Sequence, residues 1–395
     1  MERRLPAIFA ADVVGYSKMW VRTPLWDGLW MLNALWLAPL VWWLGRGHHD
    51  PLDSPINSFY LVITACFWIG HRLSSAYLAY CTAAYRPLLH SQRTRFVWVP
   101  MGIAAFVFAF LVPGDDVYSL SRVERIVALA IVDYALVTYH FASQHYGVLS
   151  LYRIRSDRPR DGRARRIDRL FALGIGGVMI FVAELLAGAA VLQDRWFDPI
   201  VDPEWLSSVH GHFQVLGTGI VVLATGGLLW AEIRTGAPSL PRAAYVVSVS
   251  LMVVTAFFVD PFVFIVMWTA QHWLVAVGLT AVLAAGEPEP GPSRWYRFWN
   301  AVNRRRWSVL LVLGLISVTL MPVMEVEAVD DETARYGPQV FPFLTDLLAA
   351  PGMVPALIAL GFASAFIHYA MDRSVFRFSD PEVRHAARGL LSPGR

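Results

Sequence analysis

The chain has 395 residues, of which 56% are hydrophobic and only 16% are charged, and its mean hydropathy is +0.48. This composition excludes a soluble protein, because many apolar runs are long enough to cross a bilayer. The net charge of +3 comes from arginines between those runs, so nucleic acid is not expected as a partner. The two cysteines, Cys66 and Cys81, exclude a disulfide framework and any Cys-based zinc or iron–sulfur motif.

The first eighteen residues, MERRLPAIFAADVVGYSK, do not share the apolar pattern of the rest. They resemble the opening strand of the catalytic domain of class III adenylate/guanylate cyclases, in which Asp12 matches a metal-binding aspartate. The resemblance stops before the first apolar run, and a lone strand cannot fold or cyclise a nucleotide. We therefore expect residues 1–18 to be a remnant with no independent fold, and Met19 to be an alternative start.

Ten segments are long and apolar enough to cross a hydrocarbon core of about 30 Å as helices. The expected fold class is therefore all-α, a polytopic transmembrane helix bundle. Its weakest boundary is the one between the seventh and eighth spans, because only Asp260 and Pro261 separate them. The ten expected spans are residues 24–44, 57–81, 96–113, 123–151, 170–192, 209–232, 243–259, 261–285, 307–326 and 350–372.

Charge alternates between the connections. Arginines follow the second, fourth and eighth spans, whereas aspartates and glutamates follow the third, fifth and ninth. Because arginine collects on the cytoplasmic side, this alternation predicts both termini in the cytoplasm and a place in the cytoplasmic (inner) membrane. We expect one transmembrane domain over residues 19–380 and a cytoplasmic tail over residues 381–395. The eight arginines between Tyr152 and Leu170 enforce topology in this interpretation, and docking of an electron donor is the alternative.

Five histidines lie inside the expected spans, where an imidazole loses its hydrogen bonds to water and needs another partner. Counting about 1.5 Å per residue from the cytoplasmic ends places them about 5 to 20 Å deep, so all five can meet in the cytoplasmic half of the bilayer or near its midplane. We therefore predict a metal site that draws on His71, His140, His145, His272 and His368.

Several polar residues are candidates to complete that site. Asp372 lies four residues after His368, and Gln144 lies four after His140, so each shares a helix face with a histidine. Asp133 and Glu184 are carboxylates inside spans and are expected to be ligands or proton carriers. His210 and His212 begin the sixth span at the outer side, which leaves open whether they form a second site.

Imidazoles with few carboxylates and no thiolate suit iron, copper or zinc, with non-haem iron preferred for oxidation of a hydrophobic, lipid-soluble substrate by oxygen. The HxxxH and HxxHH boxes of membrane desaturases are absent from the sequence. The segments WIGHRLSSAYL, YHFASQHYGVLSLYR, TAQHWLVAVGL and FIHYAMDRSVFRF resemble in layout the Brp/Blh-type membrane β-carotene dioxygenases. That resemblance implies one iron held by His71, His140 or His145, His272 and His368.

Two other functions fit the same histidines. Histidines on facing helices ligate haem b in electron-transfer proteins of the membrane. A proton-coupled transporter would instead use the histidines with Asp133 and Glu184 as a relay, and it would show internal pseudo-symmetry, which the sequence lacks. A Soret band distinguishes haem from non-haem iron.

Overall fold

The computed structural model describes residues 19–46, 55–156, 161–195, 202–235, 238–286, 293–324 and 353–391. Every regular element in these ranges is helical, so the all-α prediction is confirmed there. The chain divides into two compact units. The first includes residues 1–60 and 138–275, the second residues 61–137 and 276–390, and three helices pass from one into the other: α4 (Pro55–Ile63), α9 (Arg122–Arg155) and α14 (Pro261–Ala284).

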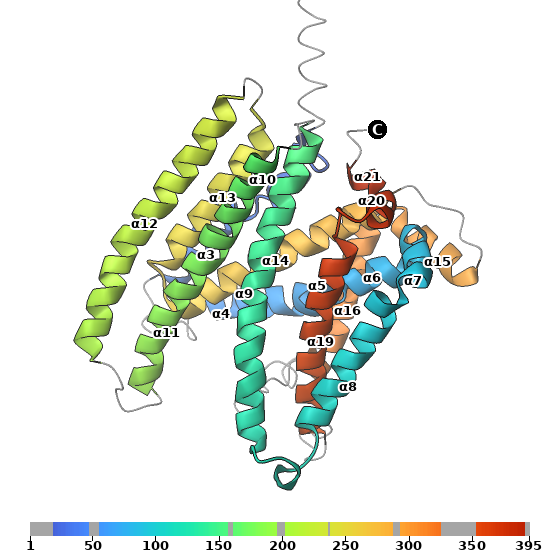
Figure 1. Cartoon of the computed structure of the whole chain (residues 1–395), viewed down its shortest axis with the longest axis horizontal. Helices are drawn as coiled ribbons and strands as arrows, with labels where there is room; N and C mark the ends of the chain where they lie inside the picture. The colour runs from blue at the N-terminus through green and yellow to red at the C-terminus, as the bar shows by residue number, and fades with distance from the viewer. Residues whose placement is uncertain are drawn as a thin grey trace, which may run out of the picture. The chain divides into compact units, whose positions relative to one another are not determined.

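The first unit packs α13 between α3 and α12, and η6 lies against α13 as well (Figure 1). Close packing of α9 against the π-helix η6 depends on glycine, because a Cβ at Gly177 would lie 2.8 Å from Cβ of Ala142. The elements of this unit are α2 (Pro24–Trp30), α3 (Ala34–Gly45), α10 (Gly162–Leu173), η6 (Gly174–Met179), α11 (Ile180–Arg195), α12 (Pro203–Ile233) and α13 (Leu240–Ala256).

The second unit is built on α19, which packs along α8, and on α16, which packs against α5 and η2 (Figure 1). Its apolar core joins Val107 and Leu111 of α8 to Ile126 of α9 and Ile358 of α19. The elements are η2 (Thr64–Trp68), α5 (Ile69–Arg72), α6 (Ser74–Cys81), η3 (Ala83–Tyr85), α7 (Arg86–Ser91), η4 (Thr94–Trp98), α8 (Val99–Leu111), η5 (Asp115–Val117), α15 (Arg294–Asn303), α16 (Arg306–Met324), α19 (Val354–Val375), α20 (Pro381–Ala386) and α21 (Arg388–Leu391).

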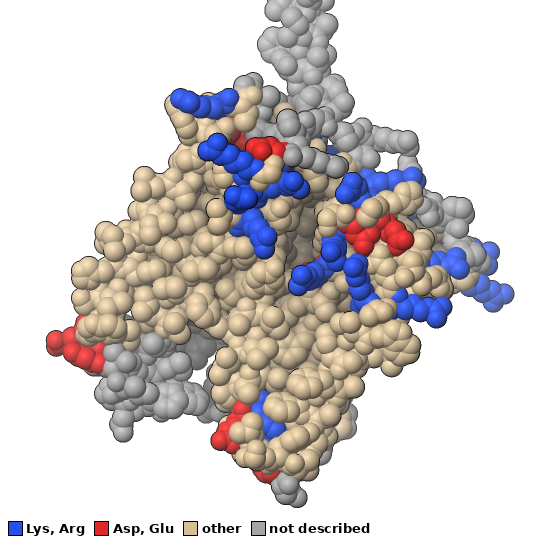
Figure 2. Space-filling model, in the orientation of Figure 1, with Lys and Arg blue, Asp and Glu red and all other residues tan. Residues whose placement is uncertain are grey.

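Each of the ten expected spans coincides at least in part with helix in the described ranges. Six helical stretches there are long and apolar enough to cross a membrane, and a seventh is obtained if α2 and α3, which meet at 41°, form one bent span. Leu240–Ala256 and Arg306–Met321 are shorter apolar helices. In Figure 2 the charged side chains gather near the ends of the long helices, and the surface between is almost free of charge. The protein is therefore a multi-pass membrane protein, and ten spans with cytoplasmic termini remain a prediction.

The weakest predicted boundary is present in the structure. Helix α13 ends at Ala256 and α14 begins at Pro261. The Asp260 carboxylate accepts a hydrogen bond from the Phe262 backbone N–H at 2.8 Å, as a residue that caps a helix N-terminus does. Proline then suits the first helical position, because it lacks an N–H that the helix would leave unpaired.

Four charged side chains form a buried network in the first unit. Asp168 of α10 accepts from Arg153 of α9 and, at 2.5 Å, from Arg242 of α13. Arg242 also pairs with Glu232 of α12, and Glu232 accepts from the Ser239 backbone N–H at 2.6 Å. Two positive and two negative groups thus compensate each other on four helices. Arg153, one of the eight arginines expected to serve topology or docking, is consequently a buried ion-pair partner.

The connection between α9 and α10 ends in a helix cap. The Asp161 carboxylate accepts from the backbone N–H groups of Arg163 and Ala164, and these hydrogen bonds lower the pKa of its carboxyl group. The cap fixes where α10 begins, which in turn places Asp168 two turns along that helix.

Candidate metal centre

His71 and His368 face each other from helices α5 and α19. Their rings are 4.5 Å apart between centroids and meet edge to face. Both side chains are buried, with 4% and 2% of their residue surface exposed. Two imidazoles packed this closely and away from water are available to a metal or to each other, but not to solvent.

Hydrogen bonding orients the first of these rings. Nδ1 of His71 lies 2.9 Å from the backbone carbonyl of Trp68, which can only accept, so Nδ1 carries the proton and Nε2 is the basic nitrogen. Metal-binding histidines are held in this way in many proteins, with one nitrogen donating to a carbonyl and the other turned to the ion.

A carboxylate accompanies the second ring. Nδ1 of His368 lies 3.4 Å from Oδ1 of Asp372, one helical turn further along α19. The same oxygen accepts a hydrogen bond from the Ser75 hydroxyl of α6. Asp372 is thereby fixed beside His368, in the position that the four-residue spacing predicted. Ser75 gives no signal of this role in the sequence, because its partner is almost three hundred residues away.

The backbone around His71 is set by its contact with α16. Helix α5 follows the π-helix η2, and the Ile69 backbone N–H donates to the Ser317 hydroxyl at 3.1 Å. A Cβ at Gly70 would lie 2.5 Å from the backbone carbonyl oxygen of Leu313. Only glycine permits this approach, so the residue before His71 fixes how closely the two helices pack.

His140 and His272 form a second pair, on α9 and α14. Their ring centroids are 4.8 Å apart and the rings meet edge to face. His272 is fully buried and stacks on the ring of Phe141 at 3.7 Å between centroids. The aromatic face restricts the orientation of the imidazole and excludes water from one side of it.

Gln144 holds His272 from two directions. Its Oε1 lies 2.9 Å from Nδ1 of His272, and its Nε2 donates to the backbone carbonyl of the same residue at 3.3 Å. The amide oxygen can only accept, so Nδ1 carries the proton and Nε2 is left as the basic nitrogen. Gln144 was predicted to orient a histidine, and its partner in the structure is His272.

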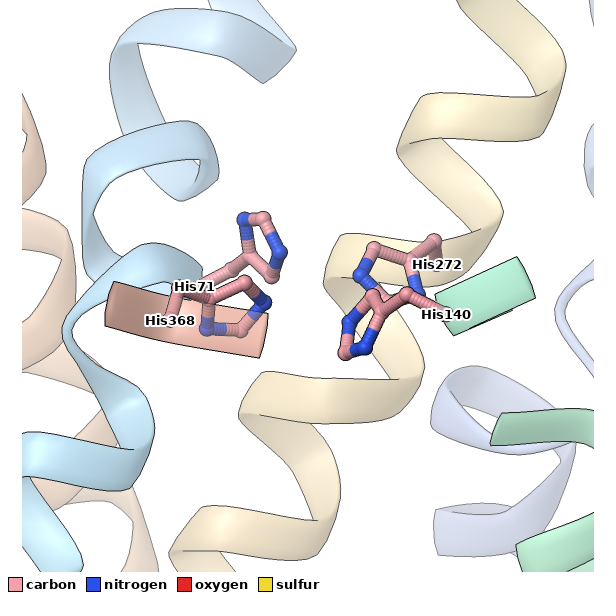
Figure 3. Close-up of side chains that lie close together, drawn as sticks. All are labelled: His71, His140, His272 and His368. Atoms are coloured by element: carbon pink, nitrogen blue, oxygen red, sulfur yellow. The ribbon is translucent and has the colours of Figure 1, made fainter. Parts of the chain in front are cut away.

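The four buried histidines form one group. One candidate ligand nitrogen from each of His71, His140, His272 and His368 lies within 4.8 Å of all the others. Figure 3 shows the rings of the group turned toward one another from four different helices. The structure thus brings together four of the five histidines that the sequence nominated.

His145 lies outside this group. It is fully buried on α9, its Nδ1 is 2.9 Å from the Tyr245 hydroxyl, and its ring lies against Gly176, where a Cβ would approach within 2.7 Å. Five residues after His140, it projects from another face of the same helix. The group that could hold a metal therefore consists of His71, His140, His272 and His368, whereas His145 is hydrogen-bonded to Tyr245.

The remaining candidates also lie outside the group. Asp133 accepts a hydrogen bond from the Tyr369 hydroxyl at 3.0 Å, and Glu184 lies half-buried on α11. His212 is exposed, with Nδ1 2.6 Å from the Ser208 carbonyl, and His210 lies two residues before it on α12. Among the described residues, His210 and His212 belong to no group of three or more potential metal ligands.

Asp27 lies near the start of the first expected span, where a carboxylate would usually meet the interface. The structure buries it completely. It accepts from the backbone N–H groups of Val21 and Arg22 at 2.8 and 3.0 Å and from the Tyr152 hydroxyl at 2.9 Å. These donors replace water and let the carboxylate close the turn that precedes α2.

Comparison of the chain with protein-family models, with curated proteins and with solved structures found no match in any of the three. The resemblances to the Brp/Blh dioxygenases and to the cyclases rest on the quoted segments alone, and residues 1–18 lie outside the described ranges.

Proposed function

We propose that this protein is an integral-membrane metalloenzyme in which His71, His140, His272 and His368 hold non-haem iron and oxygen is used to oxidise a lipid-soluble substrate. The observation that carries the proposal is the buried group of four imidazoles with candidate ligand nitrogens within 4.8 Å of one another. Hydrogen-bonded partners at His71 and His272 support it, because such partners accompany metal-binding histidines, and the Asp372 carboxylate lies beside His368.

The spacing and chemistry of the group suit a single transition-metal ion. Nitrogens arranged tetrahedrally about 2.1 Å from a metal are roughly 3.4 Å apart, and the candidate nitrogens here lie within 4.8 Å of one another. Four neutral imidazoles favour iron, copper or zinc over the hard cations magnesium and calcium, which prefer oxygen. Iron is proposed among these three metals because the proposed reaction requires activation of O₂.

A dioxygenase reaction balances without any further reactant. A carbon–carbon double bond breaks, two carbonyl groups form, and each takes one atom of O₂, so no external reductant or proton is needed. Bound iron would supply the activation of oxygen. The protein contributes the orientation of the ligands by Gln144 and Asp372 and the exclusion of water by the surrounding apolar helices.

Haem is less well supported by the geometry. A bis-histidine haem needs two axial imidazoles separated by the thickness of a porphyrin, with a wide slot between them. Here four rings crowd together, and the histidines of each pair meet edge to face with centroids 4.5 and 4.8 Å apart. This arrangement favours a directly coordinated ion.

Metal analysis of the purified full chain tests the proposal. We expect near-stoichiometric iron without a Soret band, and a fall in bound iron of at least about 10-fold in His71→Ala, His140→Ala, His272→Ala and His368→Ala. His212→Ala is the matched control, because it removes an exposed histidine outside the group. Wild-type metal content in all four variants would overturn the assignment, and a Soret band would replace it with haem.

Activity is tested separately, with reconstituted protein, O₂ and β-carotene or a hydroxylated carotene as substrate. We expect loss of the polyene absorbance, formation of aldehydes and, with ¹⁸O₂, a labelled oxygen in each carbonyl. Iron-loaded protein that consumes no oxygen with any unsaturated lipid-soluble substrate would leave a metal protein without the proposed enzyme activity.

A further inference from the structure

A cavity of about 270 Å³ lies between the first half of α9 and helix α19. Ala130 is exposed at its edge whereas Gly361 and Ala365 are buried, so the cavity leads inward from the side of the helices. Its apolar walls are made by Ile126, Ala130, Val137, Gly361, Phe362 and Ala365.

The polar lining residues of this cavity are Asp133 and Tyr134. Asp133 accepts a hydrogen bond from the Tyr369 hydroxyl at 3.0 Å, and the Tyr369 ring is 5.7 Å from the ring of His368 between centroids. A carboxyl group offers several lone pairs, so Asp133 can accept from a ligand hydroxyl as well as from the Tyr369 hydroxyl. The polar end of the cavity is therefore one tyrosine side chain away from a proposed metal ligand.

We propose that this cavity binds the hydroxyl-bearing end of a lipid-soluble alcohol, with the hydroxyl donating to Asp133 beside Tyr369. The inference rests on the proposed function in treating that alcohol as the substrate of the histidine centre. It goes beyond that function by naming the functional group that the enzyme recognises and the helices that recognise it.

The size of the cavity indicates which part of the molecule it holds. Pockets for whole small molecules span roughly 300–1,000 Å³. At about 270 Å³, this cavity accommodates the hydroxyl-bearing end of an elongated substrate and not the whole molecule. Entry from the side avoids passage through water, which an apolar molecule would resist.

A hydroxyl fits this environment better than an ammonium group does. The walls are apolar, and burying a cation among them has a large desolvation cost unless it forms a well-made ion pair. A neutral hydroxyl needs only an acceptor, which the Asp133 carboxyl provides in either protonation state.

Photolabelling of the full chain in phosphatidylcholine vesicles tests the proposal. The probe is a sixteen-carbon primary alcohol with a diazirine near the hydroxyl end, and the competitors are unlabelled hexadecanol, hexadecane and hexadecylamine. We expect label on residues 126–137 and 361–369, and displacement by hexadecanol about 10-fold better than by hexadecane. Label spread evenly over lipid-facing helices, equal competition by the alkane, or stronger competition by the amine would overturn it.

Two kinds of variant test the cavity: one removes the hydrogen-bond acceptor at Asp133, and the other fills the space at Ala130. Asp133→Leu should lower labelling by the alcohol about 10-fold, and Asp133→Asn, which keeps an acceptor oxygen, should lower it less. Ala130→Phe should block the cavity with Asp133 intact, and Ala135→Phe, at an exposed position of α9 outside the lining, is its matched control. Wild-type labelling in both Asp133→Leu and Ala130→Phe contradicts the proposal.

Iron content measured on the same samples keeps the two hypotheses apart. Normal iron with no specific label overturns the alcohol site alone. Specific label on a chain that binds no metal overturns the metal centre and leaves the alcohol site as a binding site.

Discussion

Two buried polar clusters in this protein differ in their charge and in what they can bind. The network of Arg153, Asp168, Glu232 and Arg242 consists of full charges that neutralise each other across four helices. The histidine group consists of four imidazoles, with one carboxylate, Asp372, beside it. A balanced ionic cluster satisfies itself and stabilises packing once formed, whereas neutral nitrogen donors gathered at one point remain competent to bind a cation. Charge balance, rather than burial, distinguishes the structural cluster from the candidate site.

The largest effect is expected from breaking the ionic network. Asp168→Ala leaves Arg153 and Arg242 without their shared carboxylate, which should destabilise the folded state by about 3–5 kcal/mol. Thermal unfolding in detergent measures the loss, and metal per folded chain should not change. Replacing all four charges together by Leu and Met should restore much of the stability. A variant that unfolds normally but loses its metal would show that the two clusters are not independent.

A substitution in the histidine group should lower metal affinity more than it lowers the stability of the fold. His272→Ala removes a proposed ligand but no charge, so metal affinity should fall about 10- to 100-fold, while the metal-free protein should lose only about 1–3 kcal/mol because Gln144 loses its buried hydrogen-bond partner. Isothermal titration with iron(II) under anaerobic conditions, together with thermal unfolding of metal-free samples, gives both quantities. A large loss of metal-free stability at unchanged affinity would make His272 a packing residue.

Gln144 tests whether the orientation of His272 matters for metal binding, because it contacts the proposed metal only through that histidine. Gln144→Leu should weaken metal binding about 10-fold, since the Nδ1 proton of His272 loses its acceptor at 2.9 Å. Gln144→Glu keeps an acceptor at that place and should recover most of the affinity. Equal loss in the two variants would instead indicate that the amide donor to the His272 carbonyl matters more.

The smallest effect is expected at Ser75, whose hydroxyl donates to Asp372. Ser75→Ala removes one hydrogen bond to a carboxylate and should weaken metal binding by a few fold, in line with about 1 kcal/mol. Ser91→Ala is the control, because its hydroxyl is exposed and bonds Glu382 instead. The same titration checks the result, and an effect as large as that of His272→Ala would place Asp372 among the ligands.

Hydrophobicity and helical depth predicted much of this architecture. Apolar length alone located the helical segments. Counting residues along them placed His71, His140, His272 and His368 at compatible depths of about 5 to 20 Å. The turn at Asp260 and Pro261 was the weakest predicted boundary, and the structure has helix ends on both sides of it, as a capping residue followed by proline allows. His145 was the exception, since depth says nothing about which face of a helix a residue occupies until the neighbouring helices are known.

Long-range polar pairing could not be predicted. Asp168 and Glu232 lie in segments rich in charge or at helix ends, where solvated residues are usual, and only the folded chain shows that Arg242 joins them. The burial of Asp27 could not be predicted for the same reason, because its donors include Tyr152, more than a hundred residues away. Pairing at this distance depends on which helices pack, and hydropathy does not report that.

Gly70 restricts which amino-acid substitutions this protein can accept next to His71. The atom that faces it is a main-chain oxygen of Leu313, whereas a Cβ at Gly314 would meet the main-chain oxygen of Cys66 at an ordinary contact distance of 3.7 Å. No replacement of a neighbouring side chain can make room for a larger residue at position 70, because every amino acid carries the same carbonyl. A suppressor of Gly70→Ala would have to shift helix α16 as a whole, and with it the place where His71 presents its nitrogen.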